Sequence, residues 1–187
     1  MNCTITNTKD YQNMVEKYIS TKCLKSRLKI ELEKILEKYP KIILNIERVL
    51  KYGVSFLDIV TLIVFEKDHD DAYKYKFMLE PSYPFSRPEI YCNDIMYSDF
   101  LKISSNRMLK HLKNIYNKDC LCCDSYICIE NWNLTTKLIN IIHEINYNRQ
   151  LKKNIIIKIL CDKIVDKYLI SDICLDKYLF SSDHLLV

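Results

Sequence analysis

The chain has 187 residues, of which 49% are hydrophobic and 11% aromatic, and its formal net charge is +4. This composition excludes a disordered chain, and the small charge, evenly mixed with acids, does not indicate nucleic-acid binding. No signal pattern and no apolar run of about 18 residues is present, so we expect an intracellular protein that binds no membrane and keeps its nine cysteines reduced.

An amphipathic helix is the first strong pattern along the chain. Leu24, Leu28 and Leu32 recur at four-residue steps within residues 22–39, and Pro40 ends the helical pattern. Residues 1–21 are predicted to form an N-terminal arm or a short helix capped by Thr8.

Four segments then have the alternating or β-branched patterns of strands, which are residues 42–50, 57–65, 73–79 and 89–92. Three of the four prolines lie between the last two segments and favour a rigid, extended loop. Strands that follow one another, with helices before and after, predict an α+β domain with an antiparallel four-stranded meander.

Helices dominate the remaining pattern. We expect a turn at residues 96–100, and helices at residues 106–116, 135–147 and 154–168 and from Ser171 onward. A Lys- and Asn-rich joint at residues 146–154 is expected to separate the second helix from the third.

A run of cysteines stands before the only tryptophan: Cys120, Cys122, Cys123 and Cys128 precede Trp132. Such a run is compatible with a reactive thiolate, with a structural metal or with a buried core segment. Within the run, Cys128 alternates with Tyr126 as in a strand, which favours core packing for Cys128. The metal alternative is zinc, held by Cys120, Cys122 or Cys123 together with Cys128. It lacks a second Cys-x-x-Cys pair and a nearby histidine.

Three blocks of sequence resemble ubiquitin-conjugating enzymes (E2). Arg27–Leu32 is similar to their opening helix, Tyr73–Ile90 to their third strand, Tyr-Pro-Phe loop and fourth strand, and Glu130–Lys137 to the Glu-Asn-Trp segment after the active cysteine. The resemblance covers residues 22–148 as an E2-like catalytic domain and leaves residues 149–187 as a C-terminal helical extension. The cysteine cluster also resembles E2-like proteins of large DNA viruses, which suits the Lys-, Ile-, Asn- and Tyr-rich composition.

The resemblance implies a fold, a reaction and partners. The fold is the ubiquitin-conjugating-enzyme fold, and the reaction is transfer of ubiquitin, or a ubiquitin-like protein, carried as a cysteine thioester. The implied partners are that modifier, an activating enzyme (E1), which alone uses ATP, and a ligase (E3). No cofactor is implied, and the expected location is the cytoplasm, of the host cell if the protein is viral, with the nucleus as the alternative.

Three spacing arguments for the nucleophile disagree. Cys123 stands nine positions before Trp132, as the resemblance implies, whereas Cys122 stands eight positions after Asn114, the candidate oxyanion donor. Cys120 is the only one of the three followed by the leucine that the family usually has. We predict Cys123 first, then Cys122, then Cys120, because the tryptophan is the strongest marker.

The resemblance also assigns residues outside the cysteine run. It implies partner binding at Tyr83, Pro84 and Phe85, and a structural role for Trp132. One departure favours an alternative function, a catalytically inactive E2 variant that binds a partner: the His-Pro-Asn triplet of the family is missing. A second departure, Leu134 in place of the usual proline after the tryptophan, weakens the implied geometry of the ligase-facing loop.

Overall fold

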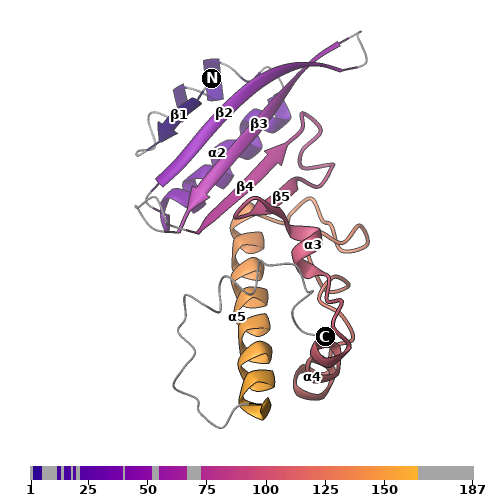
Figure 1. The fold of residues 1–187 in the computed structure, drawn as a ribbon. Helices are drawn as coiled ribbons and strands as arrows, with labels where there is room; N and C mark the ends of the chain where they lie inside the picture. Colours follow the sequence, from indigo (N-terminus) through magenta and orange to yellow (C-terminus); the bar gives the residue numbers. More distant parts are fainter. Residues whose placement is uncertain are drawn as a thin grey trace. The chain divides into compact units, whose positions relative to one another are not determined.

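The computed structural model describes residues 2–5, 12–13, 15–17, 19, 22–39, 41–51, 55–66 and 73–163. These residues form an α+β structure, which confirms the predicted class (Figure 1). The chain divides into two compact units. The first unit consists of residues 1–96 with Trp132–Ile141, and the second of Tyr97–Asn131 with residues 142–187.

An antiparallel sheet is the centre of the first unit, and its six strands lie in sequence order. They are β1 (Asn2–Ile5), β2 (Lys41–Lys51), β3 (Ser55–Phe65), β4 (Lys74–Leu79), β5 (Glu89–Cys92) and β6 (Ile95–Met96). Strands β2–β5 confirm the predicted antiparallel meander.

The strand count of four was wrong, because β1 and β6 each extend one edge of the sheet. Residues 2–5 were expected in a polar arm, but Thr4 and Ile5 are β-branched and pair with Ile43 and Ile42 of β2.

The register of the sheet aligns apolar side chains into rows. Leu44, Leu62, Phe77 and Ile90 are partners across β2, β3, β4 and β5, and all four are buried. A second row consists of the buried residues Ile42, Val64, Tyr75 and Cys92. Figure 1 shows helix α2 (Lys22–Leu36) lying along the sheet, and α2 buries its leucines at positions 24, 28 and 32. The predicted first helix is therefore confirmed.

A buried carboxylate joins α2 to two other segments of the first unit. The Glu31 side chain is fully buried, and its Oε1 lies 2.8 Å from Nε of Arg27 and accepts a hydrogen bond of 3.0 Å from the Tyr83 hydroxyl. Its Oε2 accepts a 2.9 Å hydrogen bond from the backbone N–H of Leu138, the first residue of helix α5. Arg27 also donates to the carbonyl of Thr136 at 2.6 Å. The carboxylate thus caps a helix N-terminus, where negative charge is favoured.

The second unit contains helices α3 (Tyr97–Leu101), α4 (Asn106–Tyr116) and most of α5 (Leu138–Lys163). Helix α4 has the predicted bounds, since Ser105 caps its start and Asn117, at φ 52°, ends it in the left-handed region. The expected turn at residues 96–100 was wrong, because α3 occupies this segment and buries Phe100 and Leu101.

Helix α5 is continuous where the sequence predicted a joint. The expected break at residues 146–154 was wrong, and the predicted domain boundary after residue 148 lies inside this helix. Two polar residues of the segment, Asn148 and Lys152, are buried and have partners. Asn148 donates to the Tyr97 hydroxyl at 2.8 Å, and the Lys152 ammonium donates to the carbonyl oxygens of Phe100 and Lys102.

Several sequence predictions fall outside the described residues. Only positions 12–13 and 15–17 of the predicted N-terminal helix are described, and these are helical. The end of the predicted helix at residue 168 and the short helix from Ser171 lie outside the described part of the chain.

Candidate functional site

The cysteine run is a chain of consecutive turns rather than a strand. Backbone N–H groups of Ser125, Cys128 and Asn131 each donate to the carbonyl three residues earlier, at 3.3, 3.0 and 3.0 Å. The strand-like character expected around Cys128 was therefore wrong. Residues in such turns leave many backbone groups without regular partners, so side chains must fix the path of the run.

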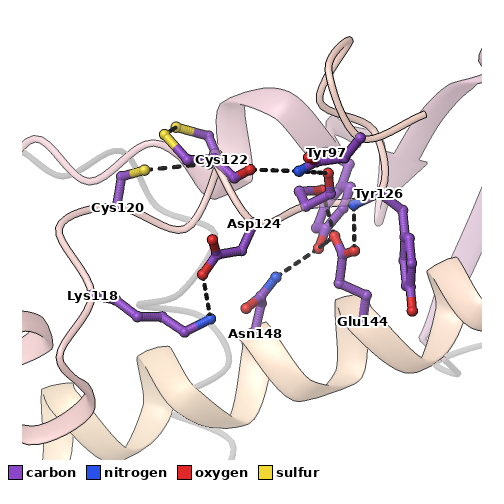
Figure 2. A network of polar contacts seen from close by, with 11 residues as sticks. Tyr97, Lys118, Cys120, Cys122, Asp124, Tyr126, Glu144 and Asn148 are labelled. Carbon is purple, nitrogen blue, oxygen red and sulfur yellow. Dashed lines mark hydrogen bonds and ion pairs between the residues drawn. The ribbon is translucent and has the colours of Figure 1, made fainter.

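Glu144 of α5 is the main side chain that holds the run (Figure 2). Its Oε1 accepts hydrogen bonds from the hydroxyls of Tyr97, at 2.7 Å, and Ser125, and its Oε2 accepts one of 2.7 Å from the backbone N–H of Tyr126. Tyr97 is itself fixed by Asn148. The Glu144 carboxylate thus attaches Ser125 and Tyr126, in the middle of the run, to helix α5.

Asn131 holds the same run from its other end. Its Nδ2 donates to the carbonyl oxygens of Cys123 and Ser125, the latter at 3.1 Å. Between these attachments, the Lys118 ammonium lies 2.9 Å from the Asp124 carboxylate (Figure 2). The backbone on the C-terminal side of Cys123 is therefore fixed by three separate side chains.

Three sulfur atoms meet at the start of the run. The Sγ atoms of Cys120, Cys122 and Cys123 all lie within 4.8 Å of one another, and those of Cys122 and Cys123 are 3.9 Å apart. The backbone N–H of Cys123 also donates to Sγ of Cys120 at 3.3 Å. Cys122 and Cys123 are exposed, Cys120 is half-buried, and Cys128 does not belong to this group.

Because the three sulfurs lie close together, their pKa values shift in different directions. Burial opposes ionisation of Cys120, but the thiol and backbone N–H of Cys123 face its sulfur and lower the pKa of Cys120 below its ordinary value. The pKa of Cys122 is raised, mainly because its thiol interacts with Cys120. The same two neighbours, Cys120 first, raise the pKa of Cys123 to about 12. The cluster therefore holds one thiolate more readily than two or three.

Asn114 was predicted as an oxyanion donor, and it lies exposed on α4. Among the described residues, no hydrogen bond links its side chain to any of the cysteines. The asparagine whose amide contacts the run is Asn131. The spacing argument that selected Asn114, and Cys122 with it, thus has no contact to support it.

The Tyr-Pro-Phe loop belongs to the first unit, and only part of it is at the surface. Tyr83 is fully buried with its hydroxyl on Glu31, and burial, followed by the nearby Glu31 charge, raises the pKa of Tyr83. Pro84 is buried too, so neither side chain is at the surface, and partner binding at Tyr83 and Pro84 stays a prediction. Phe85 is 68% exposed, and its partner binding stays a prediction.

Trp132 connects this loop to the segment after the cysteines. Its indole Nε1 donates to the carbonyl of Pro84 at 2.9 Å, and its ring centroid lies 6.2 Å from that of Tyr83. The predicted structural residue therefore contacts two residues of the Tyr-Pro-Phe loop, which lies 48 positions away in sequence. Leu134, two residues further on, is exposed.

The site offers nucleophilic or metal-binding thiols on a fixed loop, and sequence reasoning found these thiols but not what holds them. Glu144 was missed because a glutamate within a helical pattern gives no signal of an inward role. Asn131 was noticed only as part of the Glu-Asn-Trp block, and the hydrogen bonds of its amide were not expected.

Comparison of the chain with protein-family models, with curated proteins and with solved structures found no match. None of the helices in the described part of the chain combines the length and the apolar character needed to span a membrane.

Proposed function

We propose that this chain is a ubiquitin-conjugating-enzyme-like protein that holds ubiquitin, or a ubiquitin-like modifier, as a thioester on a cysteine of the run. The observation that carries the proposal is the hydrogen bond of 2.9 Å from the Trp132 indole to the Pro84 carbonyl. It joins the two sequence blocks on which the resemblance to E2 enzymes mainly rests. Two unrelated matches of this length would have no reason to meet.

The architecture of the first unit supports the same proposal. A helix with the Arg27-to-Glu31 pair precedes a meander of antiparallel strands, and the Tyr-Pro-Phe loop connects β4 to β5. Glu31 ties that helix both to Tyr83 of the loop and to Leu138, where the helix after the tryptophan begins. A ubiquitin-conjugating-enzyme-like fold of the first unit would have this order of elements.

The chemistry needs one thiolate and no cofactor bound to this chain. The sulfur attacks the carbonyl carbon of the modifier's C-terminal thioester on the activating enzyme, a new C–S bond forms, and the thiolate of the activating enzyme leaves. In the second step a lysine amine of the target, or a ligase cysteine, attacks the same carbon. The cysteine of this chain then leaves as thiolate, and the attacking amine or thiol loses a proton.

Cys123 is the first candidate for the nucleophile, because it is exposed and has the required distance in sequence from Trp132. The pKa values favour Cys120 instead, since the cluster lowers the pKa of Cys120 and raises that of Cys123. Its carbonyl is held by Asn131, which fixes the backbone beside the sulfur. Cys122 is also exposed and is the second candidate, and Cys120, which is half-buried, is the third. The role of Asn114 as oxyanion donor stays a prediction.

Exposed apolar side chains near the Pro84 to Trp132 contact suit the ligase contact implied by the resemblance. Phe85 is 68% exposed and Leu134 is 46% exposed, and each neighbours one end of that hydrogen bond in sequence. An activating enzyme, a modifier and a ligase in the cytoplasm or nucleus would be the partners.

A thioester assay tests the proposal. The full chain is incubated with activating enzymes, ATP and each of a panel of ubiquitin-like modifiers, and adducts are resolved with and without a reducing thiol. We expect an adduct that the thiol removes and that one of Cys123→Ser, Cys122→Ser or Cys120→Ser abolishes. Cys128→Ser is the matched control and should leave the adduct unchanged. Absence of an adduct with every modifier would contradict the proposal.

A second function is favoured by the clustering of the three sulfurs, because a thioester needs only one of them. In this alternative the chain is an E2-like module that binds ubiquitin or another partner without catalysis. Binding of ubiquitin in solution by a chain that forms no thioester would support it, and an adduct dependent on one cysteine would exclude it.

A further inference from the structure

We infer that Cys120, Cys122 and Cys123 together form a zinc site with three protein ligands and one open coordination position. Three thiol sulfurs within 4.8 Å of one another on four consecutive residues are more than one nucleophile requires. The sulfurs of Cys122 and Cys123 are 3.9 Å apart. Two thiolates at the usual Zn–S length of about 2.3 Å in a tetrahedron are about 3.8 Å apart.

The donor set selects the class of metal. Three thiolates and no oxygen ligand favour a thiophilic ion such as zinc over magnesium or calcium, which prefer oxygen. Among the described residues, no fourth Cys, His, Asp or Glu atom joins the group within that distance. The fourth position of the zinc would therefore be taken by water or by a ligand from outside the chain.

The residues around the three cysteines also favour metal binding. The Cys123 N–H that donates to the Cys120 sulfur is an outer contact of the kind that orients a ligating thiolate. The backbone after Cys123 is fixed by Asn131 and, through Ser125 and Tyr126, by Glu144. Because Cys122 and Cys123 are exposed, an ion has a path to the site from solvent.

Zinc would also control the reactivity of the run. Binding releases the thiol protons to solvent and places all three sulfurs on the metal, so none is free to attack a thioester. This consequence rests on the proposed function, whereas the zinc site itself does not. Where both hold, zinc and the modifier compete for the same sulfur.

Metal binding is measured first, on the reduced full chain without any modifier. Zinc is titrated against a competing chelator, and cobalt is used as a probe because thiolate-to-cobalt absorption reports the sulfur ligands. We expect one metal per chain. We also expect Cys120→Ser, Cys122→Ser and Cys123→Ser each to weaken zinc binding at least about tenfold, the smallest loss typical even for an outer-contact residue.

Cys128→Ser is the matched control, since this cysteine lies in the same run but outside the cluster. It should bind zinc as the unmodified chain does, and far-UV circular dichroism verifies that each variant is folded. Failure to bind one zinc, or binding that survives the three cluster substitutions, would overturn the site. Loss of binding in Cys128→Ser would overturn the assignment of its ligands.

The competition is measured second, in the thioester assay with zinc added after the activating enzyme has been charged. We expect the rate of transfer to this chain to fall as zinc occupies the site and to recover when a chelator is added. A chain that binds zinc but forms no thioester even after the zinc is removed would refute the proposed function and leave the metal site standing. A thioester that forms equally fast with zinc bound would refute the competition alone.

Discussion

Each of the two units contains a glutamate that has three polar partners, and the partners of the two glutamates differ in kind. Glu31 of the first unit is fully buried and has a guanidinium, a hydroxyl and a helix N–H as partners. Glu144 of the second unit is half-buried, and its partners are two hydroxyls and one backbone N–H. Each carboxylate therefore satisfies three groups, but only Glu31 neutralises a charge.

The difference indicates what each carboxylate is for. The partners of Glu31 come from a helix, a loop and the start of a second helix, so its removal would disturb the core. Two of the three partners of Glu144 are neighbours in an irregular run. We infer that Glu31 maintains the fold of the first unit, whereas Glu144 maintains the conformation of the cysteine run.

Glu31→Ala should have the largest effect on stability. It leaves the guanidinium of Arg27, whose side chain is 15% exposed, without its carboxylate, and it removes the acceptors of Tyr83 and Leu138. We expect the free energy of unfolding of the first unit to fall by about 3–5 kcal/mol, as for other broken buried pairs. Denaturant unfolding followed by the fluorescence of Trp132 measures it.

Glu33→Ala is the control, because Glu33 is an exposed residue of the same helix. Its effect should stay within about 0.5 kcal/mol. Equal unfolding midpoints for Glu31→Ala and Glu33→Ala would contradict a structural role for the buried cluster.

Glu144→Ala should loosen the cysteine run with little effect on the first unit. The N–H of Tyr126 and the hydroxyls of Ser125 and Tyr97 lose their acceptor, which costs about 1–3 kcal/mol locally. Hydrogen exchange at the Tyr126 amide should become about 10–100-fold faster. The thiols of the run should react more evenly with an alkylating agent.

Glu130→Ala gives the comparison for this variant, because Glu130 is an exposed residue of the same run. It should leave exchange at Tyr126 unchanged. If Glu144→Ala moves the Trp132 unfolding transition as far as Glu31→Ala does, the division of roles between the two glutamates is wrong.

The apolar framework was predictable from the sequence, because periodicity depends on neighbours in the chain. The segments predicted as strands at residues 42–50, 57–65, 73–79 and 89–92 each lie within about two residues of β2–β5. The inward polar residues were not predictable, since their partners are far away in sequence. Asn148 and Lys152 looked like a solvated joint, yet they bond Tyr97 and two carbonyls about 50 residues earlier.

The candidate site also has a part that the sequence predicted well and a part that it did not. Residue type and spacing found Cys120, Cys122 and Cys123, and the structure brings their sulfurs together. Spacing taken from the family resemblance also selected Asn114, which has no contact with them in the described residues. The role of Asn114 therefore stays a prediction, and the structure places this residue on the exposed face of α4.

The role of Glu31 can also be tested through the pH dependence of stability, because the pKa of this carboxyl is shifted in the folded state. Burial, opposed mainly by the charge of Arg27, raises the pKa of Glu31 above its ordinary value of 4.5. A raised pKa in the folded state contributes stability that is complete below that value and is lost as the pH rises through the folded pKa. Relative to Glu31→Gln, which does not titrate, the unmodified chain should therefore lose stability as the pH rises from 4.5 through the raised pKa of Glu31. Parallel stability curves for the two proteins would refute this.

Removal of the ion pair between Lys118 and Asp124 should have the smallest effect on stability. The two charged atoms are 2.9 Å apart, but the Asp124 side chain is 65% exposed, so solvent screens the pair. Asp124→Asn should cost at most about 0.5 kcal/mol in the local stability of the run at low salt. This cost should disappear at high salt.

The matched variant is Asp119→Asn, which breaks a 2.8 Å pair with Lys113 whose side chains are 66% and 82% exposed. It should have no measurable effect at either salt concentration, because neither partner is held in place by burial. Hydrogen exchange at the Tyr126 amide measures both variants. A larger effect at position 124 than from Glu144→Ala would mean that the salt bridge, and not the carboxylate of α5, maintains the conformation of the cysteine run.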